Sequence, residues 1–305
     1  MDKSDIELLG QITDADKIFN GAYNIRKDCE SIERHVTDNI NIVPKKDVSG
    51  IDIIIKENTQ NEEVYIPVIL TRSGLKDVVY NDFHVGKNAN VVIYAGCGIH
   101  NAHEKDAEHD GIHRFFLDEG ATVKYIENHY GEGEGTGKKI LNPVTELTLK
   151  DGAVFEMETT QIKGVDSTVR ITKAELGANA NLIVKEKIMT HDEQFGSTEF
   201  ELELNGENSS ANLTSRAVAV GNSVQSFVSK VYGNSKCFSH VSCDAIIKDN
   251  AKVTSIPEIT ANNVEANLVH EAAIGKIAQE QLVKLMTLGF SEEEAEEEII
   301  KGFLK

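Results

Sequence analysis

Residues 151–159 read DGAVFEMET, and the order of residue types in this segment recurs along most of the chain. An acidic residue and a glycine, both common in turns, precede a small residue, Ala153. Apolar and polar side chains then alternate, with Phe155 and Met157 on the same side. A period of two is the spacing at which side chains share one face of a β-strand. The segment is therefore predicted to be a turn followed by a half-buried strand.

Seven further segments follow a degenerate form of this order, and their small residue recurs at intervals of 14 to 32 residues. Each begins with turn residues and continues as a strand, as a coil of a parallel β-helix does, and coils must stack because one coil cannot bury its inner face alone. A β-sandwich also has many short strands, but it has no reason to reuse one turn, so the pattern favours the β-helix. The segments are KNANVVIYA (87–95), EGATVKYIE (119–127), NANLIVKEK (179–187), SSANLTSRA (209–217), GNSKCFSHV (233–241), DNAKVTSIP (249–257) and VEANLVHEA (264–272).

Both ends of the chain have helical rather than strand periodicity. From Ile51 the period is two, and after His270 it returns to the helical value. We therefore expect a helical N-terminal segment over 1–45, a β-helix core over 46–270 and a helical segment over 271–305. The N-terminal apolar positions at helical spacing are Ile6 and Leu9, and then Ile25, Cys29, Ile32 and Val36.

The last 35 residues are predicted to form a helical hairpin. Gly289 follows the first apolar stripe where a C-cap glycine belongs, and Ser291 with Glu294 forms a capping box that opens the second helix. The apolar stripe of the first helix comprises Ile274, Ala278, Leu282, Leu285 and Met286.

Composition excludes several classes of function. The formal net charge of -19 would repel a phosphate backbone, so nucleic acid is not an expected partner. No run of about 18 apolar residues predicts a membrane span, and the N-terminus lacks the pattern of a signal peptide, so we expect a cytoplasmic protein. Four cysteines in 305 residues are too few for a disulfide framework, and free thiols are available to metals.

The C-terminal sequence HEAAIGKIAQEQLVKLMTLGFSEEEAEEEIIKGFL (270–304) resembles the C-terminal signature of SufB and SufD, the scaffold subunits of the SUF iron–sulfur assembly system. The similarity continues upstream through CDAIIKDNAKVTSIPEI (243–259), GKKILNPVTE (137–146) and HDGIHRFFLDEGA (109–121). It implies a right-handed parallel β-helix with flanking helices, in agreement with the repeat. It also implies pairing through the β-helices and binding of the ABC-type ATPase SufC by the C-terminal helices, for which Leu282, Leu285, Met286 and Phe290 are the candidate contacts.

Two cysteines near the end of the β-helix are candidate ligands of a transient iron–sulfur cluster. Cys237 and Cys243 are six residues apart, so on one uninterrupted strand both thiols project from the same face, with His240 on the other. Soft thiolates suit iron–sulfur chemistry, but free cysteines are equally common as small buried apolar residues. The resemblance favours Cys243, because its position is the one implied to hold the nascent cluster in SufB.

His270 and Glu271 supply a nitrogen and an oxygen donor at the predicted junction between strand and helix. By residue type alone, a structural histidine is the simpler interpretation of His270. The resemblance implies instead that it faces the cluster cysteine across a subunit interface, so that a homodimer completes each site from two chains. Glu271 is a weaker candidate and Asp244 weaker still.

Two further motifs are expected to be uninvolved in chemistry. CGIHNAHEKDAEHDGIHRF (97–115) contains Cys97 and four histidines and suggests a mononuclear metal site, but its Gly, Asn and Asp content favours a solvated loop. GEGEGTGKKI (131–140) fails as a phosphate loop, because Glu132 replaces the first glycine and Lys139 replaces the magnesium-binding hydroxyl.

The expected function is a cluster scaffold that is not itself an enzyme and that works with the SufC-type ATPase. A cysteine desulfurase or another sulfur donor would supply sulfur, although no residue here aligns with the second SufB cysteine. The alternative is an acidic β-helix enzyme, either metal-dependent or acting on carbohydrate. The absence of Trp and an aromatic content of 6% disfavour sugar stacking.

Overall fold

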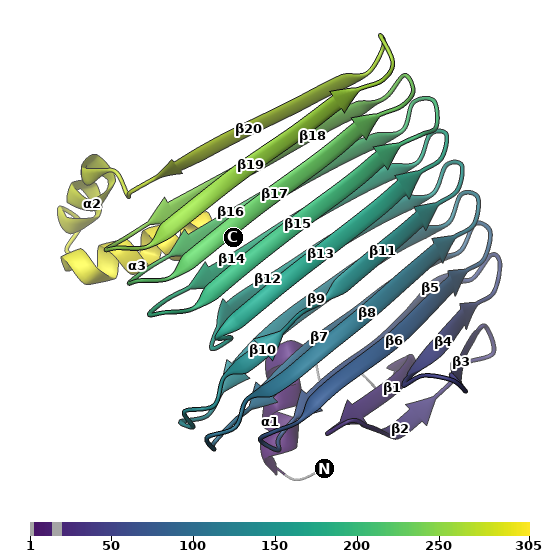
Figure 1. Ribbon diagram of the computed structural model, residues 1–305, viewed down its shortest axis with the longest axis horizontal. Helices are drawn as coiled ribbons and strands as arrows, with labels where there is room; N and C mark the ends of the chain where they lie inside the picture. The colour runs from purple at the N-terminus through teal and green to yellow at the C-terminus, as the bar shows by residue number, and fades with distance from the viewer. Residues whose placement is uncertain (1–2, 14–19) are drawn as a thin grey trace.

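The computed structural model describes residues 3–13 and 20–305 of the chain, and the strands form a β-helix of two parallel-stranded sheets (Figure 1). From β4 onward the chain alternates between the sheets, with β10 and β11 together forming one pass through the second sheet, and each pass pairs in parallel with that of the next coil. The pairs β1–β2 and β3–β4 at the N-terminal end are antiparallel. The first sheet contains β2 (Glu30–His35), β1 (Ala22–Lys27), β5 (Gln60–Leu70), β7 (Asn90–His100), β9 (Thr122–Glu132), β12 (Val154–Lys163), β14 (Asn181–Thr190), β16 (Ser210–Ala219), β18 (Phe238–Ile247) and β20 (Asn267–Gly275). The second contains β3 (Ile40–Pro44), β4 (Gly50–Ile55), β6 (Lys76–Val85), β8 (Ala107–Leu117), β10 (Lys139–Leu141), β11 (Val144–Leu149), β13 (Ser167–Leu176), β15 (Phe195–Leu204), β17 (Val224–Gly233) and β19 (Lys252–Ala261).

The recurring turn in the sequence is one corner of the coil. Asn88, Gly120, Gly152 and Asn179 occupy equivalent places in successive coils and have φ values of 55°, 67°, 70° and 57°. Only glycine and, less readily, asparagine adopt this left-handed conformation at low cost. The alanine that follows each of them points inward and is buried. At these four positions the predicted repeat marks the same corner of successive coils, whereas Ala211 pairs with Leu182, two positions farther along, and Ala251 lies at another corner, between β18 and β19.

A continuous apolar core fills the β-helix between the sheets. Aromatic rings stack from coil to coil, with Phe83 and Phe115 parallel at 4.2 Å and Phe155 edge-on to Phe115 at 4.9 Å between ring centroids. Such contacts stabilise the stack beyond the burial of apolar area. The core therefore depends on stacking of neighbouring coils, as the sequence repeat requires.

The N-terminal segment differs from the prediction. Residues Lys3–Ile12 form helix α1, as Ile6 and Leu9 predicted, but Ile25 and Ile32 lie on the antiparallel strands β1 and β2. The expected helix over residues 25–36 is therefore wrong. β1 pairs in parallel with β5, and this backbone pairing outweighs the helical spacing of the apolar residues.

The C-terminal helices begin later than expected. β20 pairs with β18 as far as Gly275, so Ile274 lies on a strand, and the residue predicted next on the helical stripe, Ala278, is the N-cap of α2 (Gln279–Met286). Helix α3 (Glu292–Phe303) follows, and its predicted capping box is present between Ser291 and Glu294. Gly289, with a φ of 103°, lies in the turn between the helices.

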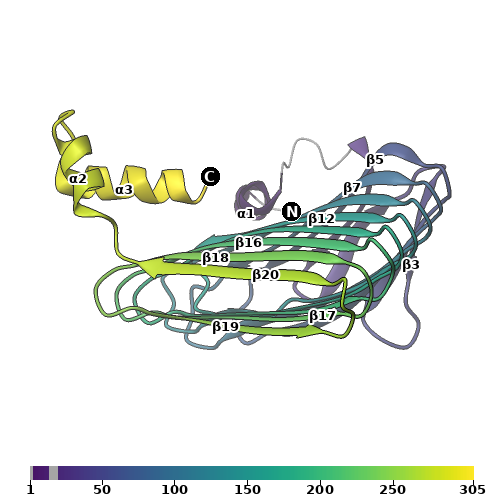
Figure 2. The same ribbon diagram turned by 90° about the horizontal axis from the view of Figure 1, so that it is seen from above.

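Helices α1 and α3 lie over the outer face of the first sheet, α1 toward the N-terminal coils and α3 toward the last ones, while α2 lies beyond the end of β20 (Figure 2). Gly98 leaves room for Leu8 of α1, since a Cβ there would lie 2.8 Å from that side chain. Arg216 of β16 donates a hydrogen bond to the carbonyl of Phe303 at 2.9 Å, which holds α3 against the sheet. Among the described residues, none of the helices has the length and apolar character that a membrane span requires.

The last coil leaves two strand edges uncovered. β20 is the final strand of the first sheet and β19 the final strand of the second, so each pairs on one side only. Apolar side chains are exposed there, including Ile259 at 45% and Ile274 at 40%. Unpaired edges of this kind are available for pairing with another chain.

Candidate metal centre in the last two coils

Cys243 lies inside the β-helix, one coil before its open end. It belongs to β18, where inward and outward residues alternate, and only 1% of its surface is exposed. Burial raises the pKa of Cys243 to about 11. The thiol is therefore protonated at neutral pH, and a thiolate forms there only when a metal binds or when water enters.

His270 lies on the neighbouring strand β20 and also points inward, because it pairs with the buried Val241. Its Nδ1 lies 3.2 Å from Oγ of Ser229 on the opposite sheet, and its Nε2 is buried without a hydrogen-bond partner among the described residues. Burial lowers the pKa of His270, which favours the neutral imidazole that ligates metals. An unpartnered buried nitrogen is costly, and its lone pair is available to a ligand.

Cys243 and His270 are diagonal neighbours on the inner face. Cys243 pairs with Ala272 and Val241 pairs with His270, so the two residues are one strand and two positions apart. The spacing of strands and the rise per residue place their Cα atoms about 8 Å apart. The thiol and the imidazole of one chain can therefore approach a common ion or small cluster.

The other predicted ligands lie elsewhere. Cys237 is inward-facing and buried, as predicted, but it precedes Cys243 by six residues, or about 20 Å along an extended strand. Glu271 and Asp244 point outward, and Glu271 pairs with His240 at 3.0 Å. The residues predicted from sequence thus do not converge on one point, and of these candidates Cys243 and His270 are the two that are neighbours on the inner face.

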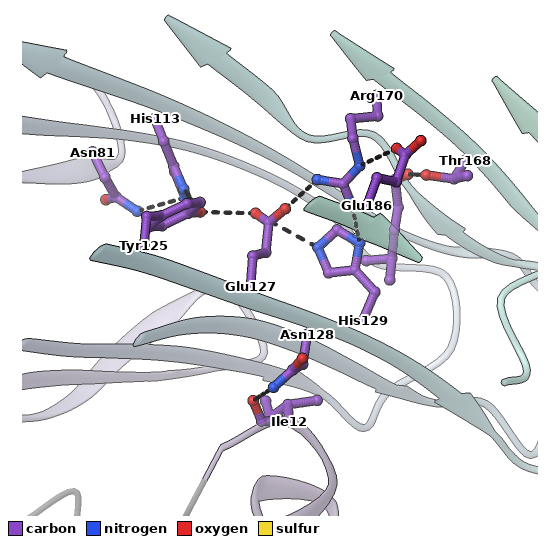
Figure 3. Close-up of polar contacts among 11 residues, drawn as sticks. Ile12, Asn81, His113, Tyr125, Glu127, Asn128, His129, Thr168, Arg170 and Glu186 are labelled. Carbon is purple, nitrogen blue, oxygen red and sulfur yellow. Dashed lines mark hydrogen bonds and ion pairs between the residues drawn. The ribbon is translucent and has the colours of Figure 1, made fainter. Parts of the chain in front are cut away.

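A polar network runs through the interior of the β-helix, and the sequence analysis did not find it; Figure 3 shows the part of it around Glu127 and Arg170. Arg170 forms ion pairs with Glu127 and Glu186, and Ser215 donates a hydrogen bond to Glu186 at 2.6 Å. Glu186, Ser215 and Cys243 occupy equivalent inward positions on three successive strands of the first sheet. Burial alone would raise the pKa of Glu127, but Arg170 and two histidines hold it well below the usual range.

Comparison with known proteins agrees with this architecture. The family described as SUF system FeS cluster assembly, SufBD core domain, matches residues 79–303. The chain belongs to the SufBD family. It is similar to a SufBD-family iron–sulfur cluster assembly protein of Pyrococcus horikoshii, with 30% identity over 77% of this chain and 71% of the relative. A second such protein, from Methanocaldococcus jannaschii, is 33% identical over 60% of this chain and 58% of the relative. A third, from Archaeoglobus fulgidus, is 25% identical over 92% and 73%.

The predicted loop of this SufBD chain at residues 97–115 is mostly strand, so that interpretation is wrong. Cys97 is on β7, and His109 and His113 are on β8, all three pointing inward, while only 101–106 form a loop. His100 faces outward and pairs with Glu132 at 3.0 Å. The even separation of His109 and His113 was a usable signal, because on a strand it puts both rings on one face.

The glycine-rich segment 131–140 joins strands β9 and β10, and no helix follows it, so it lacks the strand–loop–helix geometry of a phosphate loop. Its glycines allow close backbone packing. A Cβ on Gly135 or Gly137 would lie within 2.3 Å of the neighbouring corner loop.

The candidate partner surface on the C-terminal helices differs in detail from the predicted one. Leu282 of α2 is buried, and Leu285 of the same helix is half-buried. Met286 and Phe290 are exposed, as a contact surface requires. Two residues outside the predicted set, Val283 at 49% and Leu288 at 71%, extend the exposed apolar surface.

Proposed function

We propose that this chain is a non-catalytic scaffold that binds a nascent iron–sulfur cluster as cargo through Cys243 and His270. The observation that carries the proposal is the pairing of a buried thiol with an unpartnered imidazole nitrogen on the inner face of the last two coils. One thiolate and one imidazole form a weaker ligand set than four cysteines, so the cluster can be released to an acceptor protein. The SufBD relatives are named as iron–sulfur cluster assembly proteins, which supports the same reading.

A SufC-type ABC ATPase is the proposed partner, bound through Met286, Leu288 and Phe290. β20 covers Cys243, and only residues 276–278 separate β20 from α2. A displacement of the helices would therefore pull directly on the strand that encloses the thiol. ATP hydrolysis in the partner would in this way expose the site for loading by a cysteine desulfurase or another sulfur donor, and for release.

We further propose that a second copy of the chain pairs on the uncovered edges of β19 and β20. Because Cys243 and His270 of one chain share an inner face, the geometry supports a site whose two ligands come from the same chain. This differs from the expectation that each site is divided between two subunits. The second copy would then shield the site from water rather than supply the imidazole.

Anaerobic reconstitution with ferrous iron and sulfide tests the cluster assignment. The wild-type chain is expected to develop thiolate-to-iron charge-transfer absorption, and Cys243→Ser and His270→Ala should each lose most of it while keeping the far-ultraviolet circular dichroism of the folded chain. Cys29→Ser, which removes a half-exposed thiol between β1 and β2, outside both proposed metal sites, is the control and should retain it. Full absorption in either site variant would remove that residue from the ligand set.

A mixed dimer distinguishes the two arrangements of ligands. After subunit exchange between Cys243→Ser and His270→Ala chains, a same-chain site leaves no intact ligand pair, so absorption should stay absent. Recovery of about half the wild-type absorption would show that each site takes its two ligands from different chains.

A further inference from the structure

A second cluster of metal-binding side chains lies inside the β-helix, away from the last two coils. Cys97, His109, His113, His129 and Glu127 line one enclosed cavity of about 10 Å³. That space suits a single water molecule or a single ion. The cavity lies between β7 and β9 of the first sheet and β8 of the second, whereas Cys243 is on β18.

The ring nitrogens of two histidines converge on the place where residue 111 has no side chain. A Cβ on Gly111 would lie 3.2 Å from Nε2 of His109 and 3.2 Å from Nε2 of His113. Both nitrogens therefore border the same small space, which any residue larger than glycine would occupy. His109 and His113 are four apart on β8, so both rings share its inner face.

In both histidines Nδ1 carries the proton of the neutral ring, and Nε2 is therefore a hydrogen-bond acceptor. Nδ1 of His109 lies 3.2 Å from the carboxylate of Asp77, which can only accept, so the proton is on Nδ1. Nδ1 of His113 lies 2.7 Å from the hydroxyl of Tyr125, and that hydroxyl donates to Glu127. The proton is again on Nδ1, and Nε2 carries a lone pair that now accepts from Asn81 at 3.3 Å (Figure 3). A carboxylate or hydroxyl behind an imidazole is the arrangement that orients histidine ligands of metals.

The charges in this part of the interior leave a place for a cation. The carboxylates of Asp77, Glu127 and Glu186 face two guanidinium groups, those of Arg26 and Arg170. One negative charge is therefore in excess, and a Cys97 thiolate would add another. A divalent cation balances both, and it would replace the thiol proton, whose loss burial otherwise opposes by raising the pKa of Cys97.

We propose that this cavity binds one divalent transition-metal ion of the Zn²⁺, Fe²⁺ or Co²⁺ type through Cys97 Sγ, His109 Nε2 and His113 Nε2. One thiolate and two imidazoles are a donor set for such borderline ions and not for Mg²⁺ or Ca²⁺. In the ion-free chain these three donors do not all lie within 4.8 Å of one another, so binding includes a side-chain rotation that draws them together and displaces the Asn81 amide. The ion would tie β7 to β8 across the interior, independently of the cluster site.

Cobalt content of the full-length chain tests the proposal. Because the cavity is enclosed, the protein is produced in medium supplemented with Co²⁺, so that the ion is present during folding, and is then dialysed against EDTA. The measurement is made in the Cys243→Ser/His270→Ala double variant, a background that lacks the proposed cluster ligands. Cobalt binding by this variant therefore does not depend on whether the cluster assignment is right. We expect about one cobalt per chain, with thiolate-to-cobalt charge-transfer absorption.

Adding Cys97→Ser and His109→Ala to this background should lower the cobalt content at least about tenfold. Gly111→Ala keeps every donor but fills the shared space, and it should have the same effect, while His100→Ala, an exposed histidine of the same segment, should have none. Circular dichroism confirms that each variant is folded. Absence of cobalt from the background protein, or retention of one cobalt in the Gly111→Ala and Cys97→Ser/His109→Ala variants, would overturn the proposal.

Discussion

Replacing Arg170 by methionine tests whether the buried charge network is balanced as the structure describes. Arg170 lies on β13 with 4% of its side chain exposed, and it pairs with Glu127 and, at 3.7 Å, with Glu186. Methionine keeps a flexible, unbranched side chain, although a shorter one, and removes the charge. Glu127 then keeps only the hydroxyl of Tyr125 as a close hydrogen-bond donor, at 2.9 Å, with His129 farther away at 3.8 Å.

The expected cost is large because the carboxylates remain. Removing one partner of a buried ion pair typically costs about 3–5 kcal/mol, whereas removing both can be nearly neutral. The total free energy of unfolding of a protein is typically about 5–15 kcal/mol. Arg170→Met should therefore lose a substantial part of this stability at pH 7.5. Adding Glu127→Gln should restore about 1–3 kcal/mol, since one uncompensated charge is removed.

The loss of stability in Arg170→Met should become smaller as pH decreases. In the wild-type chain the pKa of Glu127 is low, so its contribution to stability is present above its unfolded pKa and is lost as pH falls through the folded pKa. Without Arg170, burial dominates and raises the pKa of Glu127 above the unfolded value. Protonation then stabilises the folded variant, and its deficit relative to wild type should shrink between pH 7.5 and pH 5.

Urea unfolding followed by far-ultraviolet circular dichroism measures the deficit at both pH values. Arg216→Met, which removes a partly exposed arginine from β16, is the control and should cost much less. A deficit below about 1 kcal/mol at pH 7.5, or one that grows toward pH 5, would refute the assignment of a desolvated, balanced network.

Three further outcomes follow from burial and capping. Burial lowers the pKa values of His113 and His129 to about 4, so below the unfolded value of about 6.5 the unfolded chain binds more protons. The free energy of unfolding, measured by urea titration, should therefore fall as pH decreases from 6.5 to 4, with a slope of up to about 2.7 kcal/mol per pH unit for two protons; a flat profile would contradict this. Iodoacetamide should modify the half-exposed Cys29 well before Cys243, as peptide mass spectrometry can check, and equal rates would mean that the last coil opens readily. Ser291→Ala should lower the stability of α3 by about 1 kcal/mol, measured by hydrogen exchange of its amides, because the capping box is lost; unchanged protection would contradict it.

The β-helix itself was predictable from local pattern. A turn residue with positive φ, a buried alanine and an alternating strand recur at the corners that contain Asn88, Gly120, Gly152 and Asn179, and every one of these preferences concerns residues adjacent in sequence. The capping box of α3 and the inward direction of Cys243 follow from the same short-range rules. The helix predicted over residues 25–36 was wrong because these residues form strands, and the pairing of β1 with β5 is a contact between segments distant in sequence.

Within the repeated segments, sequence alone therefore determined the turn, the strand that follows it and the face on which each side chain lies, because a strand places alternate residues on opposite faces whatever its neighbours are. Only the tertiary structure decided which inward residues meet. The register between coils puts His270 diagonal to Cys243 and leaves Cys237 and Glu271 apart from them, and it gathers Cys97, His109 and His129 from three strands around one cavity. Register depends on the number of residues in each intervening turn and on long-range backbone hydrogen bonds, and neither is encoded in the local alternation of polar and apolar side chains.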